Sequence, residues 1–185
     1  MTDKKVFKAR LIEKKVVAKD TVLMKFKPER EIKPLPGQFF MVSREKSRFF
    51  LKRPFSIHYY YPENGNFKLL IRVKGEGTKE ITSIRFGEKL QFIGPLGNSF
   101  PVSKKLKTAV VAGGIGIAPF AYLMAELVRK ENEVDLYYGE RSKKDLVEYW
   151  RSKKVNHFIT TDDGSEGKKG CITDVFSFKG YDRVY

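Results

Sequence analysis

The sequence predicts a two-domain β plus α/β protein, an antiparallel β-barrel followed by a parallel α/β domain. Short runs of alternating apolar and polar residues fill the first hundred positions, and proline- and glycine-containing turns separate them. After a lysine-rich stretch the pattern changes to strand, glycine turn, helix and strand. We therefore expect domains at 1–101 and 102–185. The chain has 185 residues and is 41% hydrophobic, which is ample for packed cores.

Two runs in the first domain carry the strand pattern. Val22, Met24 and Phe26 alternate with mostly polar neighbours, and a second alternation covers residues 67–74. Half-buried antiparallel strands have this period of two. Turn signals lie at 34–37, 62–65 and 94–97, a spacing typical of a small barrel. One helix is expected at 78–85.

In the second domain apolar strands alternate with helical segments. The pattern predicts strands at 108–112, 134–138 and 155–160, and helices at 119–130 and 144–150. Such alternation implies a parallel sheet covered by helices.

Composition excludes several kinds of site. Cys171 is the only cysteine, so the chain has no intrachain disulfide and cannot alone ligate a zinc or an iron–sulfur cluster through cysteines. His58 and His157 are far apart and show no metal-ligand spacing, so no metal site is expected. No apolar run approaches the length of a membrane span, and no secretory core follows the amino terminus. We expect a cytoplasmic protein.

The net charge of +15 admits two interpretations. A basic surface can capture a nucleic acid through its phosphates, but the lysines occur as scattered doublets and no nucleic-acid-binding motif accompanies them. We therefore expect no nucleic acid, and favour an acidic redox partner subunit.

A glycine turn follows the first strand of the second domain and precedes a helix. Gly113, Gly114 and Gly116 permit close backbone approach, and a helix start offers unpaired amides to a pyrophosphate. Pro119 stands where a dinucleotide fingerprint has its third glycine. A purely structural strand–helix turn remains an alternative.

A second phosphate signal lies in the first domain. Arg53 can clamp a phosphate through two parallel hydrogen bonds, and Ser56 can donate to a ring nitrogen. Pro54, a rigid residue, and Phe55, an aromatic one, stand between them, which suits a planar ring with a phosphate tail such as a flavin. The turn Gly75-Glu76-Gly77-Thr78 can hold the same phosphate through the Gly77 and Thr78 amides and the Thr78 hydroxyl.

Together these motifs resemble the ferredoxin–NADP reductase superfamily, and most closely the electron-transfer subunits of dihydroorotate dehydrogenase. The resemblance covers almost the whole chain and includes segments 53–57, 75–78, 94–100, 112–119, 138–141 and 160–165 with Gly167 and Gly170, in the family's order. It implies a flavin-binding barrel and a nicotinamide-binding α/β domain.

The resemblance also implies residue roles. Ser56 would hydrogen-bond near the hydride-accepting nitrogen and is the residue nearest to catalysis, while Asp162 and Asp163 sit in a sequence that favours a turn or a ribose contact. The implied cofactor-binding residues are Arg53, Pro54, Phe55, Ser56, Ile57, Gly75, Gly77, Thr78, Gly113, Gly114, Gly116, Pro119, Arg141 and Asp162.

The sequence departs from the family at its end. Residues 181–185 begin a further predicted strand, whereas relatives continue with a Cys-Gly-Pro segment and, in the dihydroorotate subunits, with cysteines that hold a [2Fe–2S] cluster. Those ligands are absent here, which is expected of either a fragment or a shortened relative.

The expected function is electron transfer from NADH or NADPH through FAD, with FMN as the alternative flavin, to a partner, the catalytic subunit of dihydroorotate dehydrogenase. The alternative enzyme is a ferredoxin–NAD(P) reductase-type subunit of a hydrogenase or sulfite reductase. A basic binding module on a degenerate reductase scaffold is the non-enzyme alternative, and it predicts a protein without flavin.

Overall fold

The computed structural model describes residues 6–147 and 152–185. The chain divides into two compact units. The first consists of Asp20–Phe100 and the preceding chain up to Val16, and the second consists of Pro101–Tyr185 together with Val17–Lys19. Each unit has its own sheet, so each is described by itself.

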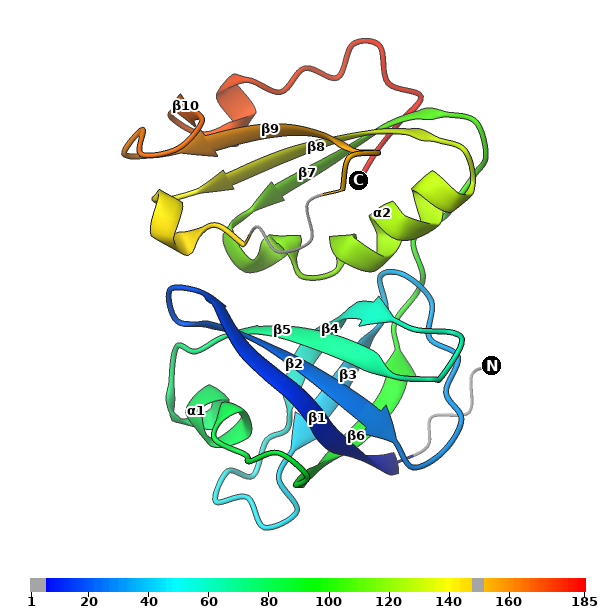
Figure 1. Ribbon diagram of the computed structural model, residues 1–185, viewed down its shortest axis with the longest axis vertical. Helices are drawn as coiled ribbons and strands as arrows, with labels where there is room; N and C mark the ends of the chain where they lie inside the picture. The colour runs from blue at the N-terminus through cyan, green and yellow to red at the C-terminus, as the bar shows by residue number, and fades with distance from the viewer. Residues whose placement is uncertain (1–5, 148–151) are drawn as a thin grey trace. The chain divides into compact units, whose positions relative to one another are not determined.

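The first unit is a closed barrel whose strands follow the order β1-β2-β5-β4-β3-β6 (Figure 1). Strand β1 pairs antiparallel with β6, β2 with β5, β5 with β4, and β3 with both β4 and β6. The strands are β1 (Val6–Ala18), β2 (Thr21–Pro28), β3 (Phe39–Ser43), β4 (Arg53–Tyr60), β5 (Phe67–Arg72) and β6 (Lys89–Leu96). The antiparallel barrel predicted from the alternating runs is confirmed.

Phenylalanine rings fill the interior of this barrel. Five of them come from five different strands and none is more than 5% exposed: Phe7, Phe26, Phe40, Phe67 and Phe92. The ring centroids of Phe67 lie 5.0 Å from Phe40 and 5.2 Å from Phe92. Burying one such side chain contributes about 1.5–3 kcal/mol. This cluster therefore contributes substantially to the stability of the barrel.

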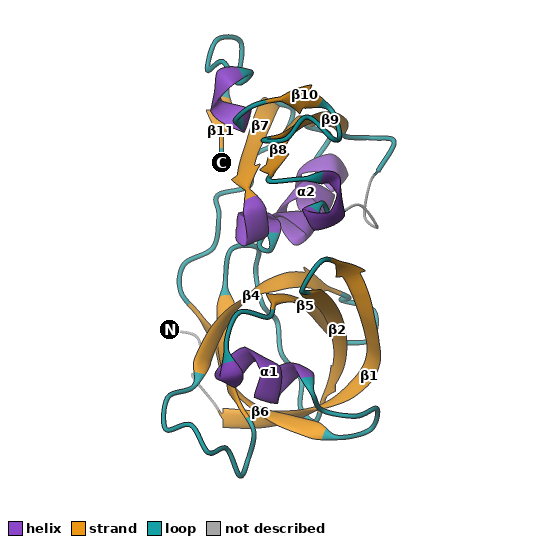
Figure 2. Ribbon diagram, turned by 90° about the vertical axis from the view of Figure 1, so that its left-hand side faces the viewer, coloured by secondary structure: helices purple, strands orange, loops and turns teal. Residues whose placement is uncertain are grey.

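Helix α1 (Glu76–Thr82) lies across one end of the barrel, between β5 and β6 in the chain (Figure 2). It begins two residues before the predicted start at 78 and ends three residues before the predicted end at 85. The hydroxyl of Thr78 accepts hydrogen bonds from the amides of Lys74 and Gly75, at 3.0 and 3.1 Å. Thr78 thus stabilises the turn from within the helix, and Gly75 takes the capping position.

The second unit is the parallel sheet that the sequence predicts, and its strands follow the order β10-β9-β8-β7-β11. Its strands are β7 (Lys107–Gly113), β8 (Glu133–Glu140), β9 (Asn156–Thr161), β10 (Lys168–Lys169) and β11 (Arg183–Val184). Helix α2 (Phe120–Arg129) covers one face, and the segment that leads to β11 covers the other (Figure 2). In the part of the chain that the structure describes, no helix has the length and apolar content to cross a membrane.

The prediction of a helix at 144–150 is wrong for residues 144–147. A single 3-10 turn covers Lys143–Asp145, and Leu146 is extended, with φ −66° and ψ 134°. Ser142 donates a hydrogen bond of 2.7 Å to the carboxylate of Asp145, which stabilises the short turn. Leu146 and Val147 are buried, so their apolar character reflects packing in an irregular segment. Residues 148–150 lie outside the described residues.

A polar cluster fastens the carboxyl-terminal segment to the sheet. Tyr181 donates a hydrogen bond of 2.6 Å to the buried carboxylate of Asp135, which also accepts one of 2.7 Å from Asn156. Because the Tyr181 proton is engaged, Tyr137 donates to the Tyr181 oxygen across 2.9 Å. Burial, and next the hydrogen bond to Asp135, raise the pKa of Tyr181 well above its usual range.

We predict that Tyr181→Phe lowers the free energy of unfolding by about 1–3 kcal/mol near neutral pH, because it leaves Asp135 short of one partner. The difference from the parent should shrink above about pH 10, where tyrosine in the unfolded chain ionises and Tyr181 in the folded chain does not. Urea unfolding of both proteins at several pH values measures this. Equal stability at pH 7 would contradict the assigned role.

Candidate functional site

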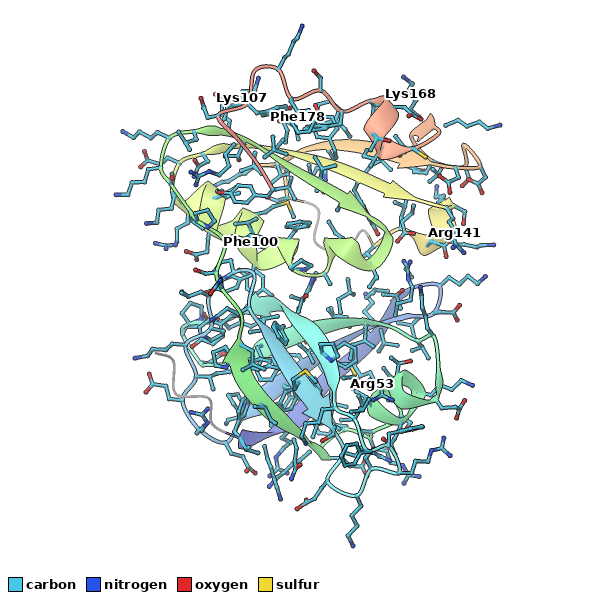
Figure 3. All side chains as sticks on the ribbon, turned by 180° about the vertical axis from the view of Figure 1, so that it is seen from behind. Arg53, Phe100, Lys107, Arg141, Lys168 and Phe178 are labelled. Carbon is cyan, nitrogen blue, oxygen red and sulfur yellow. The ribbon has the colours of Figure 1, made fainter. Side chains whose placement is uncertain are left out.

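The guanidinium of Arg53 lies against the backbone of Gly77. Arg53 is the first residue of β4, and Gly77 is in the first turn of α1, so both stand at the same end of the barrel (Figure 3). A Cβ atom at position 77 would lie 2.7 Å from both Nε and Nη2 of Arg53. A side chain at position 77 would displace the guanidinium from this place. The structure therefore brings together the two motifs that the sequence singled out.

Arg53 makes no ion pair with any carboxylate in the described ranges. Its Nη1 donates to the carbonyl of Leu51, and its Cζ lies 5.4 Å from the centre of the Phe49 ring. The nearby carboxylate of Glu76 is held instead by Arg48 and Lys79, at 2.8 and 3.0 Å. The Arg53 charge is therefore available to an anion.

The Thr78 hydroxyl is used within the turn, contrary to the expected phosphate contact. It donates to the carbonyl of Gly75 at 2.8 Å while it accepts the two amides described above. Unlike the Thr78 hydroxyl, the backbone amides of Gly77 and Thr78 are not used within the turn, because first-turn amides have no acceptor within a helix. Among the described residues none accepts from them. A phosphate beside Arg53 would therefore meet these amides and the guanidinium.

The rest of the motif follows along β4. Pro54 is exposed, Phe55 and Ser56 are half-buried, and the side chain of Ile57 is completely buried. In the described part of the chain the Ser56 hydroxyl has no hydrogen-bond partner, so it can donate to a ligand. Ile57 faces the core, and only its backbone can approach a ligand.

The glycine turn of the second unit is open at its surface. Gly113 and Gly116 are exposed, and a Cβ atom at either position would have no neighbour within 4 Å. Gly114 has φ +58°, a left-handed backbone conformation that favours glycine. A 3-10 turn at Gly114–Ile117 separates β7 from α2, and Pro119 caps that helix. In a dinucleotide fingerprint the helix opens directly at the glycine turn, whereas here the 3-10 turn comes first and α2 begins at Phe120.

Three neighbouring strands end at one edge of the sheet. Gly113 is in register with Gly139, and Gly139 with Thr160. Arg141 and Asp162 follow the ends of β8 and β9, and both are exposed (Figure 3 labels Arg141). Ligands of open parallel sheets bind beyond the carboxyl ends of the strands, where the strand order reverses. The order reverses at β7, between β8 and β11.

The two adjacent aspartates have different surroundings. The Asp163 carboxylate accepts hydrogen bonds of 2.5 and 2.9 Å from the hydroxyl and the amide of Ser165, and these lower the pKa of Asp163. Asp163 thus stabilises the turn, as the sequence indicated. The Asp162 side chain has no partner among the described residues and remains the candidate for a ribose contact.

Two features were missed at the level of sequence. Thr160 is 1% exposed, and its hydroxyl has no hydrogen-bond partner in the described structure, although it lies at the ligand-facing edge beside Gly139. The ring of Phe49 lies under Arg53. The Thr160-Thr161 pair stood in a motif of the resemblance, but nothing in the sequence signals an unpaired hydroxyl.

Both units match families of known proteins. Residues 8–100 match the oxidoreductase FAD-binding domain, and residues 110–177 match the oxidoreductase NAD-binding domain. The chain therefore belongs to the ferredoxin reductase family of FAD- and NAD-binding oxidoreductases.

Among its relatives are electron transfer subunits of dihydroorotate dehydrogenase B (NAD(+)). The subunit from Caldanaerobacter subterraneus subsp. tengcongensis is 34% identical over 168 residues, which are 91% of this chain and 65% of that protein. The subunit from Desulforamulus reducens is 36% identical, over 92% of this chain and 67% of its own length. The chain thus spans about two thirds of these relatives.

Solved structures agree with this assignment. An NADH-dependent reduced ferredoxin-NADP oxidoreductase is 26% identical, with a TM-score of 0.80 over 95% of this chain and 63% of its own. Phthalate dioxygenase reductase, 21% identical with a TM-score of 0.75 over 97% of this chain and 59% of its own, shares the fold.

Gly113→Val should leave the fold intact and impair the use of NADH or NADPH. The backbone of Gly113 is extended, with φ −116° and ψ 130°, and the new side chain points into open space where a nucleotide would approach. We expect unchanged flavin content and thermal unfolding, with at least about a tenfold loss of kcat/KM, which corresponds to about 1.4 kcal/mol of lost binding. Gly114→Val is a poorer test, because its positive φ strains any other residue. Equal reduction rates in Gly113→Val and parent would make the loop a structural turn.

Proposed function

We propose that this chain is an NAD(P)H-dependent flavin oxidoreductase subunit that passes electrons through FAD to a partner redox subunit, as dihydroorotate dehydrogenase electron transfer subunits do. The observation that carries the proposal is the Arg53 guanidinium, which has no carboxylate partner among the described residues and lies against Gly77. A cation beside open first-turn amides fits the phosphate of a flavin nucleotide.

Each residue of the barrel motif has a role in this proposal. Arg53 neutralises the flavin phosphate, and the amides of Gly77 and Thr78 bind its oxygens. Gly75 leaves the turn accessible, since a Cβ atom there would have no neighbour within 4 Å. Pro54 and Phe55 line the flavin ring. The backbone of Ile57 continues the strand beneath it.

Ser56 orients the reacting end of the ring. Its half-buried hydroxyl would donate a hydrogen bond near the hydride-accepting nitrogen and so fix the orientation of that end of the ring. When bound, FAD accepts two electrons from NAD(P)H and releases them one at a time. No side chain of the chain serves as a nucleophile, since the protein positions the cofactors.

Arg53→Ala should weaken FAD binding roughly ten- to a hundredfold, because a hydrogen bond to a charged group contributes about 1.5–3 kcal/mol. Riboflavin, which has no phosphate, should bind the variant and the parent equally. Titration of the flavin-free chain with FAD and riboflavin measures both. Arg85→Ala is the matched control, since Arg85 is an exposed arginine of the same unit. Undiminished FAD affinity in Arg53→Ala would refute the assignment.

For the second unit we propose NADH as the preferred donor. Gly113, Gly114, Gly116 and Pro119 shape the groove for the nucleotide, and Arg141 and Asp162 flank its adenosine ribose. A carboxylate at this edge can accept a hydrogen bond from the ribose 2′-hydroxyl and repels a 2′-phosphate. The names of the relatives, which specify NAD(+), support this preference.

Asp162→Asn should lower the ratio of kcat/KM for NADH to kcat/KM for NADPH by roughly tenfold or more, since it removes a charged hydrogen bond and a repulsion. Asp163→Asn changes the charge equally one residue away and should leave the ratio nearly unchanged. A similar shift in both variants would indicate a general effect of charge and exclude a ribose contact of Asp162.

The proposed partner is an acidic redox subunit, the catalytic subunit of dihydroorotate dehydrogenase. The net charge of +15 favours attraction of an acidic surface. A ferredoxin–NAD(P) reductase-type subunit is the second candidate, and the 26% identity to the ferredoxin-NADP oxidoreductase supports it. Reduction of a purified dihydroorotate dehydrogenase catalytic subunit, compared with reduction of ferredoxin, distinguishes the two.

A further inference from the structure

We propose that Phe49 is a positioning residue for Arg53, holding the guanidinium against Gly77 before a phosphate binds. Phe49 is half-buried in the loop between β3 and β4. The Cζ atom of Arg53 lies 5.4 Å from the centre of its ring, and that of Arg48 lies 5.0 Å from the same centre. The inference rests on the proposed flavin phosphate contact of Arg53.

The loop that carries Phe49 is fastened to α1. The hydroxyl of Ser47 donates a hydrogen bond of 2.6 Å to Glu80 and accepts one of 3.0 Å from the Phe49 amide. The amide of Arg48 donates to the other oxygen of Glu80 at 3.3 Å. The ring is therefore connected to the same helix that contains Gly77, so ring, guanidinium and first turn are held as one group.

Arg48 helps to neutralise the carboxylate of Glu76. It binds one oxygen of Glu76, and Lys79 binds the other. Both oxygens of the carboxylate nearest to the first turn are thus occupied by cations other than Arg53. The Phe49 ring lies against both guanidinium groups and therefore helps to keep Arg48 on Glu76 and Arg53 on Gly77.

A held guanidinium binds an anion more tightly than a mobile one. Arginine loses much rotamer freedom when its head is fixed, and a ligand that must order it bears this entropic penalty. An aromatic face and the Leu51 carbonyl reduce the penalty because they fix the side chain beforehand. The ring touches no phosphate in this arrangement and acts only through Arg53.

The test compares Phe49→Leu with Phe50→Leu. Phe50 is 99% exposed, so its variant is a control for the loss of one aromatic ring from the same loop. We expect Phe49→Leu to weaken FAD and FMN binding roughly two- to fivefold, the range of a cation–π contact near a surface. Riboflavin affinity should be unchanged, and Phe49→Tyr, which keeps the aromatic face, should restore parental affinity.

A double-mutant cycle makes the test specific. In the Arg53→Ala background, Phe49→Leu should have no further effect on FAD affinity. Parental FAD affinity in Phe49→Leu, or an equal loss of riboflavin affinity, would overturn the inference. If Arg53→Ala weakens FAD binding and Phe49→Leu does not, the proposed function stands and only this inference fails. If neither variant changes FAD affinity, both fail.

Discussion

The filling of the barrel by phenylalanine is the constraint on which the first unit depends. Rings from five strands meet in one cluster, with centroids about as close as aromatic packing allows. A small closed barrel has room for its side chains and little else. The positions of the strand ends follow from this packing, and the proposed cofactor contacts are made at those ends.

The proposed anion site at Arg53 depends on this scaffold. The core fixes the start of β4, and Ile81 of α1 is buried, so the helix is fixed as well. The remaining requirement is a residue without a side chain where the two elements meet, and Gly77 meets it. The loop before β4 then adds Phe49 and Arg48. Arg48 and Lys79 of α1 pair with Glu76, which leaves Arg53 without a carboxylate partner among the residues described.

In the second unit the register of the parallel strands brings the candidate ligand-binding residues together. Its parallel strands end in register, so a glycine turn, Arg141 and Asp162 reach one edge although they are far apart in sequence. The opposite end of β8 carries the Asp135–Tyr181 hydrogen bond, which fastens the segment before β11. That segment completes the reversal of strand order beside β7, the feature that defines a ligand edge in such sheets.

The sequence by itself determined the two kinds of sheet and the order of the motifs, because alternation with a period of two and strand–turn–helix spacing are local properties. It also supplied Arg53, Gly77 and the glycine turn. It did not determine the limits of α1, because the Thr78 hydroxyl stabilises an earlier helix start than local propensity indicates. It also did not determine the irregular segment at 144–147, where the burial of Leu146 overrides helix propensity. Only the structure shows that the Thr78 hydroxyl bonds within its own turn, that Asp163 bonds to Ser165 while Asp162 has no side-chain partner among the described residues, and that Phe49 lies under Arg53. Thr78 and Asp163 find their partners within four residues, in turns whose geometry the pattern of residue types does not specify, whereas the place of Phe49 depends on the hydrogen bonds that fasten its loop to α1.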